Sequence, residues 1–188
     1  MLRYLNGNQN NFQKKLELIL NERKLVQKNK SNTVKPIIEN VKKNGDKALI
    51  AYEKKFSNIK TKKVNLKFSQ DEINKIARRV DQKLKKAINI AFKRIKEFHI
   101  KQKIYPFKYK DKYKNELSYK YSPIDRVGVY VPGGTASYPS TVLMSCVPAI
   151  VAGVKNIFLT TPTLGQNVNP AIIYAAKKCG VKEIYKTG

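Results

Sequence analysis

Three short apolar runs that alternate with helical patterns constrain the fold of this chain more than any other feature. Nearly continuous apolar runs of this length are typical of strands in a buried parallel sheet. Strands that alternate with helices predict a parallel sheet with helical crossovers, here in the order β-α-β-α-β. Pro148 is predicted to kink or divide the first helix. The predicted strands are 127–131, 156–161 and 183–187, and the predicted helices are 140–154 and 171–178.

Helical patterns fill much of the chain before residue 121. Apolar side chains recur at one helical face over 12–20 and again over 34–44, which predicts a helix in each segment. Asn32 or Thr33 is a candidate cap for the second helix. The Asn-Gly pair that ends at Gly45 is a good signal for its end.

Local signals also order the segment between residues 46 and 102. Residues 46–56 predict a short helix, and alternation over 64–68 predicts a short strand. The tetrapeptide Ser-Gln-Asp-Glu that begins at Ser69 is a capping box, which marks the start of a helix. A long helical stretch follows and fades near Gln102, with Asp81 as a possible cap for a second segment within it.

Lysine alternates with tyrosine or phenylalanine over residues 104–121. One interpretation is a surface for single-stranded nucleic acid, with bases stacked on the rings and phosphates on the lysines. The other is an exposed two-stranded hairpin, because alternation is what half-buried strands require. We favour the hairpin.

The chain is therefore predicted to be an α/β protein with two regions. Residues 1–121 form a helical region with a short strand and the hairpin, and residues 122–188 begin a parallel-sheet domain. Three parallel strands leave an open, apolar edge, so we expect the isolated chain to aggregate. Ligands of open α/β sheets lie beyond the carboxyl ends of the strands. The Pro-Gly-Gly turn within 127–140 is either a ligand-facing loop or a plain tight turn.

The net charge of +26 is the strongest compositional signal. It is compatible with binding to nucleic acid or an anionic membrane. However, 33 of the 39 basic residues are Lys and 6 are Arg, and they are spread along the chain. Because Arg is the preferred reader of phosphates and bases, we favour a solvated surface and predict no nucleic-acid and no membrane partner. The sequence has no run of eighteen apolar residues and no apolar segment of a secretory signal near its start, so we expect a cytoplasmic protein.

Residues that usually carry chemistry are few. The single histidine, His99, cannot form a zinc site or a catalytic triad by itself. Cys146 and Cys179 have no neighbouring Cys or His in the sequence, so each is predicted to be a free, buried thiol. No pair of carboxylates is an obvious acid–base couple. We therefore predict no catalytic residue and no metal ligand in this chain.

The glycine turn belongs to a longer stretch that resembles a known family. Its sequence is PIDRVGVYVPGGTA from residue 123 to residue 136, and STVLM follows from Ser140. Further similar positions are Pro148-Ala149, Ala152-Gly153-Val154, Ala175-Ala176, Cys179-Gly180-Val181, Asn44–Leu49 and Ile95–His99. The stretch resembles the signature of histidinol dehydrogenases, and the resemblance covers essentially the whole chain.

The resemblance implies an activity and two cofactors. Members of this family are zinc-containing homodimers that oxidise L-histidinol to L-histidine in two NAD-dependent steps, through the aldehyde. Residues 122–188 would then begin a Rossmann-like NAD-binding domain. By the same resemblance Tyr130, Pro132, Pro162 and Phe56 are candidate cofactor-binding residues.

The resemblance also implies what this chain does not supply. The zinc ligands and the acid–base residues of the family are expected beyond residue 188, so the fragment is expected to be inactive alone. Two alternatives stay open from the sequence. One is a related NAD- and zinc-dependent alcohol dehydrogenase with another substrate, and the other is a basic nucleic-acid-binding module.

Overall fold

The computed structural model describes residues 5–56, 65–133, 138–163 and 168–188, and for residues 22–33 it describes the backbone alone. The chain divides into two compact units, Met1–Ala51 and Tyr52–Gly188. Each unit is described by itself. The predicted division between residues 121 and 122 stays a prediction.

The first unit contains one long helix where two were predicted. Helix α1 runs without interruption over Phe12–Asn44 and includes Pro36. The segment that was expected to separate two helices is rich in Glu, Arg, Lys, Leu and Gln, whose helix propensity outweighs the weak capping signal there. The predicted end is confirmed, because the Gly45 amide donates to the Val41 carbonyl at 2.8 Å and Gly45 has a φ of 55°. Helix α2 follows at Asp46–Phe56.

Two capped helices begin the second unit, as predicted. Helix α3 (Gln70–Arg78) starts with a complete capping box. The Ser69 hydroxyl accepts from the Glu72 amide at 3.1 Å, and the Glu72 carboxylate accepts from the Ser69 amide at 2.7 Å. Helix α4 (Gln82–Lys101) starts at Asp81, whose carboxylate accepts from the Leu84 amide at 2.8 Å. Local capping therefore determines where these helices begin.

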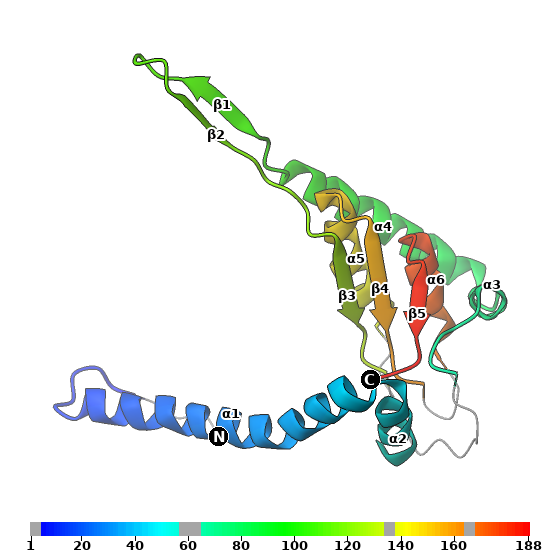
Figure 1. Cartoon of the computed structure of the whole chain (residues 1–188), viewed down its shortest axis with the longest axis horizontal. Helices are drawn as coiled ribbons and strands as arrows, with labels where there is room; N and C mark the ends of the chain where they lie inside the picture. Colours follow the sequence, from blue (N-terminus) through cyan, green and yellow to red (C-terminus); the bar gives the residue numbers. More distant parts are fainter. Residues whose placement is uncertain (1–4, 57–64, 134–137, 164–167) are drawn as a thin grey trace. The chain divides into compact units, whose positions relative to one another are not determined.

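A parallel sheet forms the centre of the second unit, in the order β3-β4-β5. Strands β3 and β4 pair in parallel, and so do β4 and β5. Helix α5 connects the first pair and helix α6 the second (Figure 1). Pro148 lies inside α5 without dividing it. The bounds are β3 Arg126–Tyr130, α5 Pro139–Ala152, β4 Asn156–Thr160, α6 Pro170–Lys178 and β5 Glu183–Tyr185.

The core lies on one side of this sheet. Val129, Leu159 and Ile184 are buried on neighbouring strands, and α5 and α6 lie behind the sheet in Figure 1. Two right-handed crossovers in a strand order of 3-4-5 place both helices on the same face. The opposite face differs from the prediction of strands buried on both sides, because Gly128 and Tyr130 of β3 are exposed.

The thiols of Cys146 on α5 and Cys179 at the end of α6 are free and buried, as predicted. The sequence did not indicate that they are neighbours, but the two side chains are hydrogen-bonded to each other. This hydrogen bond, together with burial, raises the pKa of Cys179 far above its usual range. The Cys179 thiol therefore stays protonated, and both buried side chains pack as small apolar groups.

The strand predicted over 64–68 is reduced to a single bridge. Lys67 pairs antiparallel with Tyr185 at the edge of the sheet. Two backbone hydrogen bonds flank this bridge: Phe68 donates to Ile184 at 3.0 Å, and Lys186 donates to Leu66 at 2.7 Å. Residue 64 lies outside the described part of the chain.

The predicted hairpin is present, with β1 at Phe107–Lys110 and β2 at Glu116–Tyr119 in antiparallel register. Asp111 organises its turn by accepting from the amides of Tyr113 at 2.9 Å and Asn115 at 2.8 Å. The expected exposure of the hairpin is confirmed, because every residue of both strands is exposed. Alternation indicates which residues share a face, but another element must cover that face to bury it.

Candidate functional site at the carboxyl edge of the sheet

Two of the predicted cofactor residues meet at the carboxyl ends of the strands. Tyr130 ends β3, and Pro162 follows β4 by two residues. A Cβ atom built on Gly188 would lie 2.8 Å from Cε2 of Tyr130 and 2.7 Å from Cδ of Pro162. The exit of β5 therefore runs directly against both side chains. This edge is where open α/β sheets bind their ligands.

A second close contact involves Gly133, in the turn after β3, and Pro162, in the turn after β4. A Cβ atom on Gly133 would lie 2.7 Å from Cγ of Pro162 and 2.9 Å from its carbonyl oxygen. Real Cβ atoms do not approach other atoms this closely, so only glycine fits without a shift of the Pro162 backbone. Pro132 precedes this contact and is partly exposed. The predicted ligand-facing turn is thus packed onto the turn after β4.

The side chain of Tyr130 is available to a ligand. Its exposed fraction is 55%, although it stands at the end of a strand beside the core. An exposed aromatic ring with a hydroxyl can pack against a flat cofactor ring and hydrogen-bond to it. Neighbouring side chains leave this ring uncovered on the face of the sheet that the helices do not occupy.

Phe56, the third candidate, is at the last residue of α2 and is 61% exposed. Its ring stacks on Tyr52 one turn earlier, with centroids 5.9 Å apart and planes 10° apart. The ammonium group of Lys55 lies 5.5 Å from the centre of the Phe56 ring. Stacking on a helical neighbour restricts the ring, although Phe56 is largely exposed.

Glu53, one turn before Phe56 on α2, was not predicted from the sequence. It is 5% exposed. Its Oε1 atom accepts from the Thr187 hydroxyl at 2.6 Å and from the Gly188 amide at 3.1 Å. A hydrogen bond from the Thr160 hydroxyl to the Thr187 carbonyl also holds this segment from β4. The Tyr52–Phe56 end of α2 is therefore connected to the carboxyl edge of the sheet.

A second polar cluster lies next to the exit of β5. The ammonium group of Lys186 is 2.8 Å from the Glu72 carboxylate and 4.5 Å from the centre of the Phe68 ring. The hydrogen bond from Lys186 lowers the pKa of Glu72 below its usual 4.5, and its bonds with Ser69 act in the same direction. The capping box of α3 and the end of β5 are thus joined through one carboxylate.

All four predicted cofactor residues lie at the carboxyl edge of the sheet or are connected to it. Tyr130 and Pro162 are brought together by Gly188, and Phe56 is connected to the same segment through Glu53. Pro132 lies in the turn after β3. Residues 134–137 of the family signature lie outside the described residues.

Sequence reasoning missed the contacts that join these elements. The available signal for Glu53 was weak: it is one acidic residue in the lysine-rich sequence AYEKKF. For Gly188 the signal was a glycine directly after a strand, which often marks a close backbone approach. Neither signal identifies its partner.

The described residues contain no group of three or more His, Cys, Asp or Glu side chains placed to hold a metal ion. His99 is partly buried, and its Nδ1 atom lies 2.6 Å from Oε1 of Gln102.

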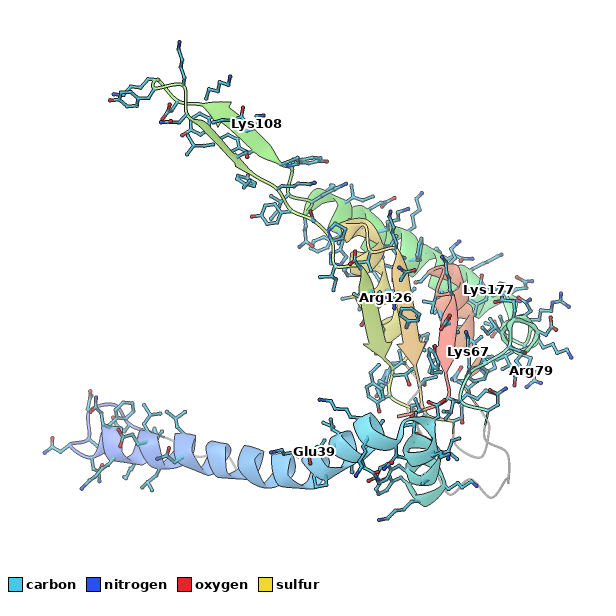
Figure 2. All side chains as sticks on the ribbon, in the orientation of Figure 1. Glu39, Lys67, Arg79, Lys108, Arg126 and Lys177 are labelled. Atoms are coloured by element: carbon cyan, nitrogen blue, oxygen red, sulfur yellow. The ribbon has the colours of Figure 1, made fainter. Side chains whose placement is uncertain are left out.

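The basic side chains are distributed over the elements. Figure 2 labels Lys67 beside β5, Lys108 on the hairpin, Arg126 on β3 and Lys177 on α6. Such dispersal is typical of a solvated surface, whereas nucleic-acid sites concentrate their cations on one face. Among the described residues, no helix combines the length and apolar character needed to span a membrane.

The geometry places the chain among α/β proteins whose ligands bind at the carboxyl ends of parallel strands. Comparison with known proteins then gives the family. The family model for histidinol dehydrogenase matches residues 20–188, and the chain belongs to the histidinol dehydrogenase family.

Known relatives agree with this assignment along the chain. A histidinol dehydrogenase of Pelagibacter ubique is 50% identical over 189 residues, which cover 100% of this chain and 43% of that protein. A histidinol dehydrogenase of Carboxydothermus hydrogenoformans is 40% identical, and the match covers 43% of that protein. The crystal structure of the Elizabethkingia anophelis histidinol dehydrogenase superposes with a TM-score of 0.79 at 40% identity, over 84% of this chain and 36% of that one. The chain therefore spans less than half the length of these relatives.

Proposed function

We propose that this chain supplies one wall of the NAD site of a histidinol dehydrogenase, which oxidises L-histidinol to L-histidine in two NAD-dependent steps. The observation that carries the proposal is the juxtaposition of Tyr130, Pro162 and Gly188 at the carboxyl edge of a parallel sheet. The family assignment supports the substrate and the cofactor, and the position on the sheet supports a nucleotide at this edge.

Each candidate residue has a role that its surroundings permit. Tyr130 packs its exposed ring against the cofactor and offers its hydroxyl as a hydrogen-bond donor. Phe56 contributes a second ring, held by its stack on Tyr52. Pro132 and Pro162 shape the two turns that border the ring of Tyr130. These residues bind and orient the cofactor, which itself accepts the hydride.

The catalytic groups are proposed to lie in the part of the family's length that this chain does not span. Zinc would act as a Lewis acid on the alcohol and on the hydrated aldehyde. Because the described residues present no set of metal ligands, we derive no step through zinc here. The fragment is accordingly proposed to be inactive alone, and its assembly as a homodimer and its cytoplasmic location remain predictions.

The competing functions have less support. The relatives from Pelagibacter ubique and Carboxydothermus hydrogenoformans and the solved structure are all named histidinol dehydrogenases, which disfavours another substrate within a wider family. A nucleic-acid module is disfavoured because the lysines are dispersed over several elements, among them α1, α4, α6 and β1.

A chimera tests the proposal. Residues 1–188 would be joined to the remaining part of the Pelagibacter ubique relative, which is 50% identical over the shared region. We expect L-histidinol-dependent formation of two NADH per substrate, measured by absorbance. The Tyr130→Ala variant should raise KM for NAD about tenfold, corresponding to about 1.4 kcal/mol, whereas Tyr119→Ala in the hairpin should not change it. A soluble, folded chimera without this activity would overturn the proposal.

A further inference from the structure

We propose that Glu53 is a positioning residue for the cofactor site, an inference that rests on the proposed function. Its buried carboxylate fixes the exit of β5 and thereby sets Phe56 in place relative to Tyr130. The cofactor itself does not have to touch Glu53.

Burial makes this carboxylate unusual. Among the described residues, Glu53 is the one charged side chain in the buried class, and the other buried polar residues are Thr161 and Thr163. Moving a carboxylate out of water costs several kcal/mol unless hydrogen bonds compensate. Glu53 receives two such bonds at Oε1, from Thr187 at 2.6 Å and from Gly188 at 3.1 Å. Bonds to a charged acceptor are shorter and stronger than neutral ones.

Both donors belong to the segment on which Tyr130 rests. Gly188 is packed so closely against Tyr130 and Pro162 that an added Cβ would overlap both side chains. Thr187 is held in addition by the Thr160 hydroxyl, which donates to its carbonyl. A shift of Thr187 and Gly188 would therefore remove the packing contact that holds the Tyr130 ring in place.

The other end of the connection is the Phe56 ring. Glu53 and Phe56 are three residues apart on α2, a spacing that places side chains next to each other on a helix. The bond from Thr187 to Glu53 spans 134 residues of sequence. Two bonds to one oxygen fix an orientation as well as a distance, because hydrogen bonds weaken steeply when they are bent. An apolar side chain at position 53 would fill space without fixing this orientation.

The experiment measures NADH binding to the chimera by fluorescence titration, in about 0.15 M salt to screen the surface lysines. Glu53→Leu should raise Kd about tenfold or more, because it removes a charged acceptor and leaves two donors unpaired. Glu53→Gln keeps a carbonyl oxygen as acceptor and should raise Kd by only about threefold. The control, Glu97→Gln, makes the same charge change in an exposed pair with Lys93 and should leave Kd unchanged.

A double-mutant cycle separates positioning from general destabilisation. If Glu53 acts by setting Phe56, then Glu53→Leu should cost much less in a Phe56→Ala background, less than about threefold. An equal loss of NADH affinity in the Phe56 and Phe56→Ala backgrounds would contradict the inference. Circular dichroism identifies variants that remain folded at the titration temperature.

If Glu53→Leu does not fold, Thr187→Val and Glu53→Gln provide the test. Thr187→Val removes the hydroxyl that donates the shorter of the two hydrogen bonds to Glu53. It should weaken NADH binding about threefold or more. Unchanged Kd values for both variants would overturn the inference.

The two proposals fail in different ways. Absence of NADH binding by the soluble, folded chimera would overturn the proposed function, and the inference with it. Binding that is weakened by Tyr130→Ala and Phe56→Ala but unaffected by every change at positions 53 and 187 would overturn the inference alone.

Discussion

The carboxyl edge of the sheet and the β1–β2 hairpin contain the same kinds of residue but are built differently. Both carry exposed tyrosines, Tyr130 at the edge and Tyr109 and Tyr119 on the hairpin. At the edge, Tyr130 is backed by Gly188 and Pro162 and stands at the end of a strand in the buried core. On the hairpin, the tyrosines have neighbours within the hairpin, and all residues of both strands are exposed.

This difference shows why exposed aromatic rings alone do not identify a site. A ring contributes to specific binding when its backbone and its neighbours are fixed before the ligand arrives. The core below the sheet supplies that rigidity, whereas an isolated two-stranded hairpin is at best marginally stable in water. The following substitutions test the comparison with matched pairs of residues.

The largest difference in the free energy of unfolding is expected between a leucine of the sheet and a leucine of the hairpin. Leu159 of β4 is completely buried, whereas Leu117 of β2 is 44% exposed. Leu159→Ala should lower the free energy of unfolding by about 2–5 kcal/mol, because it removes buried methyl groups and leaves a cavity. Leu117→Ala should lower it by less than about 0.5 kcal/mol. Urea denaturation measures both values, and similar losses would contradict the assignment of the core to the sheet.

The next effect is expected for glycine at the edge. Gly133→Ala places a Cβ against Pro162, including its backbone oxygen at 2.9 Å, whereas Gly128 of β3 has no atom within 4 Å of such a Cβ. Gly133→Ala should cost about 1–3 kcal/mol through overpacking and should weaken NADH binding. Gly128→Ala should change neither by a measurable amount. Thermal denaturation and NADH titration distinguish the two, and a harmless Gly133→Ala would show that the turns are not packed together.

The smallest effect is expected for ion pairs, compared between Glu72–Lys186 at the edge and Glu116–Lys108 on the hairpin. Because the folded pKa of Glu72 is depressed, its contribution is present above the unfolded pKa and is lost as the pH falls through the folded value. Glu72→Gln should therefore destabilise the chain at pH 7, and the difference from the unaltered chain should vanish in strong acid.

Its magnitude at pH 7 should be below about 1 kcal/mol, because the Glu72 side chain is partly exposed and solvent screens the pair. Glu116→Gln on the hairpin should have a smaller effect on global unfolding. Denaturation at a series of pH values measures this difference. A constant effect of Glu72→Gln at every pH would assign its role to packing and not to charge.

Local signals predicted most of the fold, but not the contacts that form the site. The capping residues Ser69 and Asp81 act within three residues of themselves, so the sequence shows their partners directly. The buried strands were recognisable from their apolar runs. In α1, by contrast, helix propensity over many residues outweighed a single candidate cap.

The missing information concerned residues that are far apart in the sequence. Glu53 and Thr187 become partners because the sheet brings the end of β5 to α2. By contrast, the exposed hairpin was predicted correctly, because alternation along each strand is a local signal. Periodicity indicates which residues share a face, and only the tertiary fold determines what meets that face.

The central claim is that the carboxyl edge of the sheet, and not the aromatic hairpin, is the cofactor-binding face. The most direct test is to follow the backbone amide resonances of the isotope-labelled chimera while NADH is added. We expect saturable shifts at Phe56, Tyr130, Gly133 and Gly188, with the resonances of residues 107–119 unchanged. Shifts centred on the hairpin, or spread over the lysine-rich helices and abolished by moderate salt, would contradict the claim.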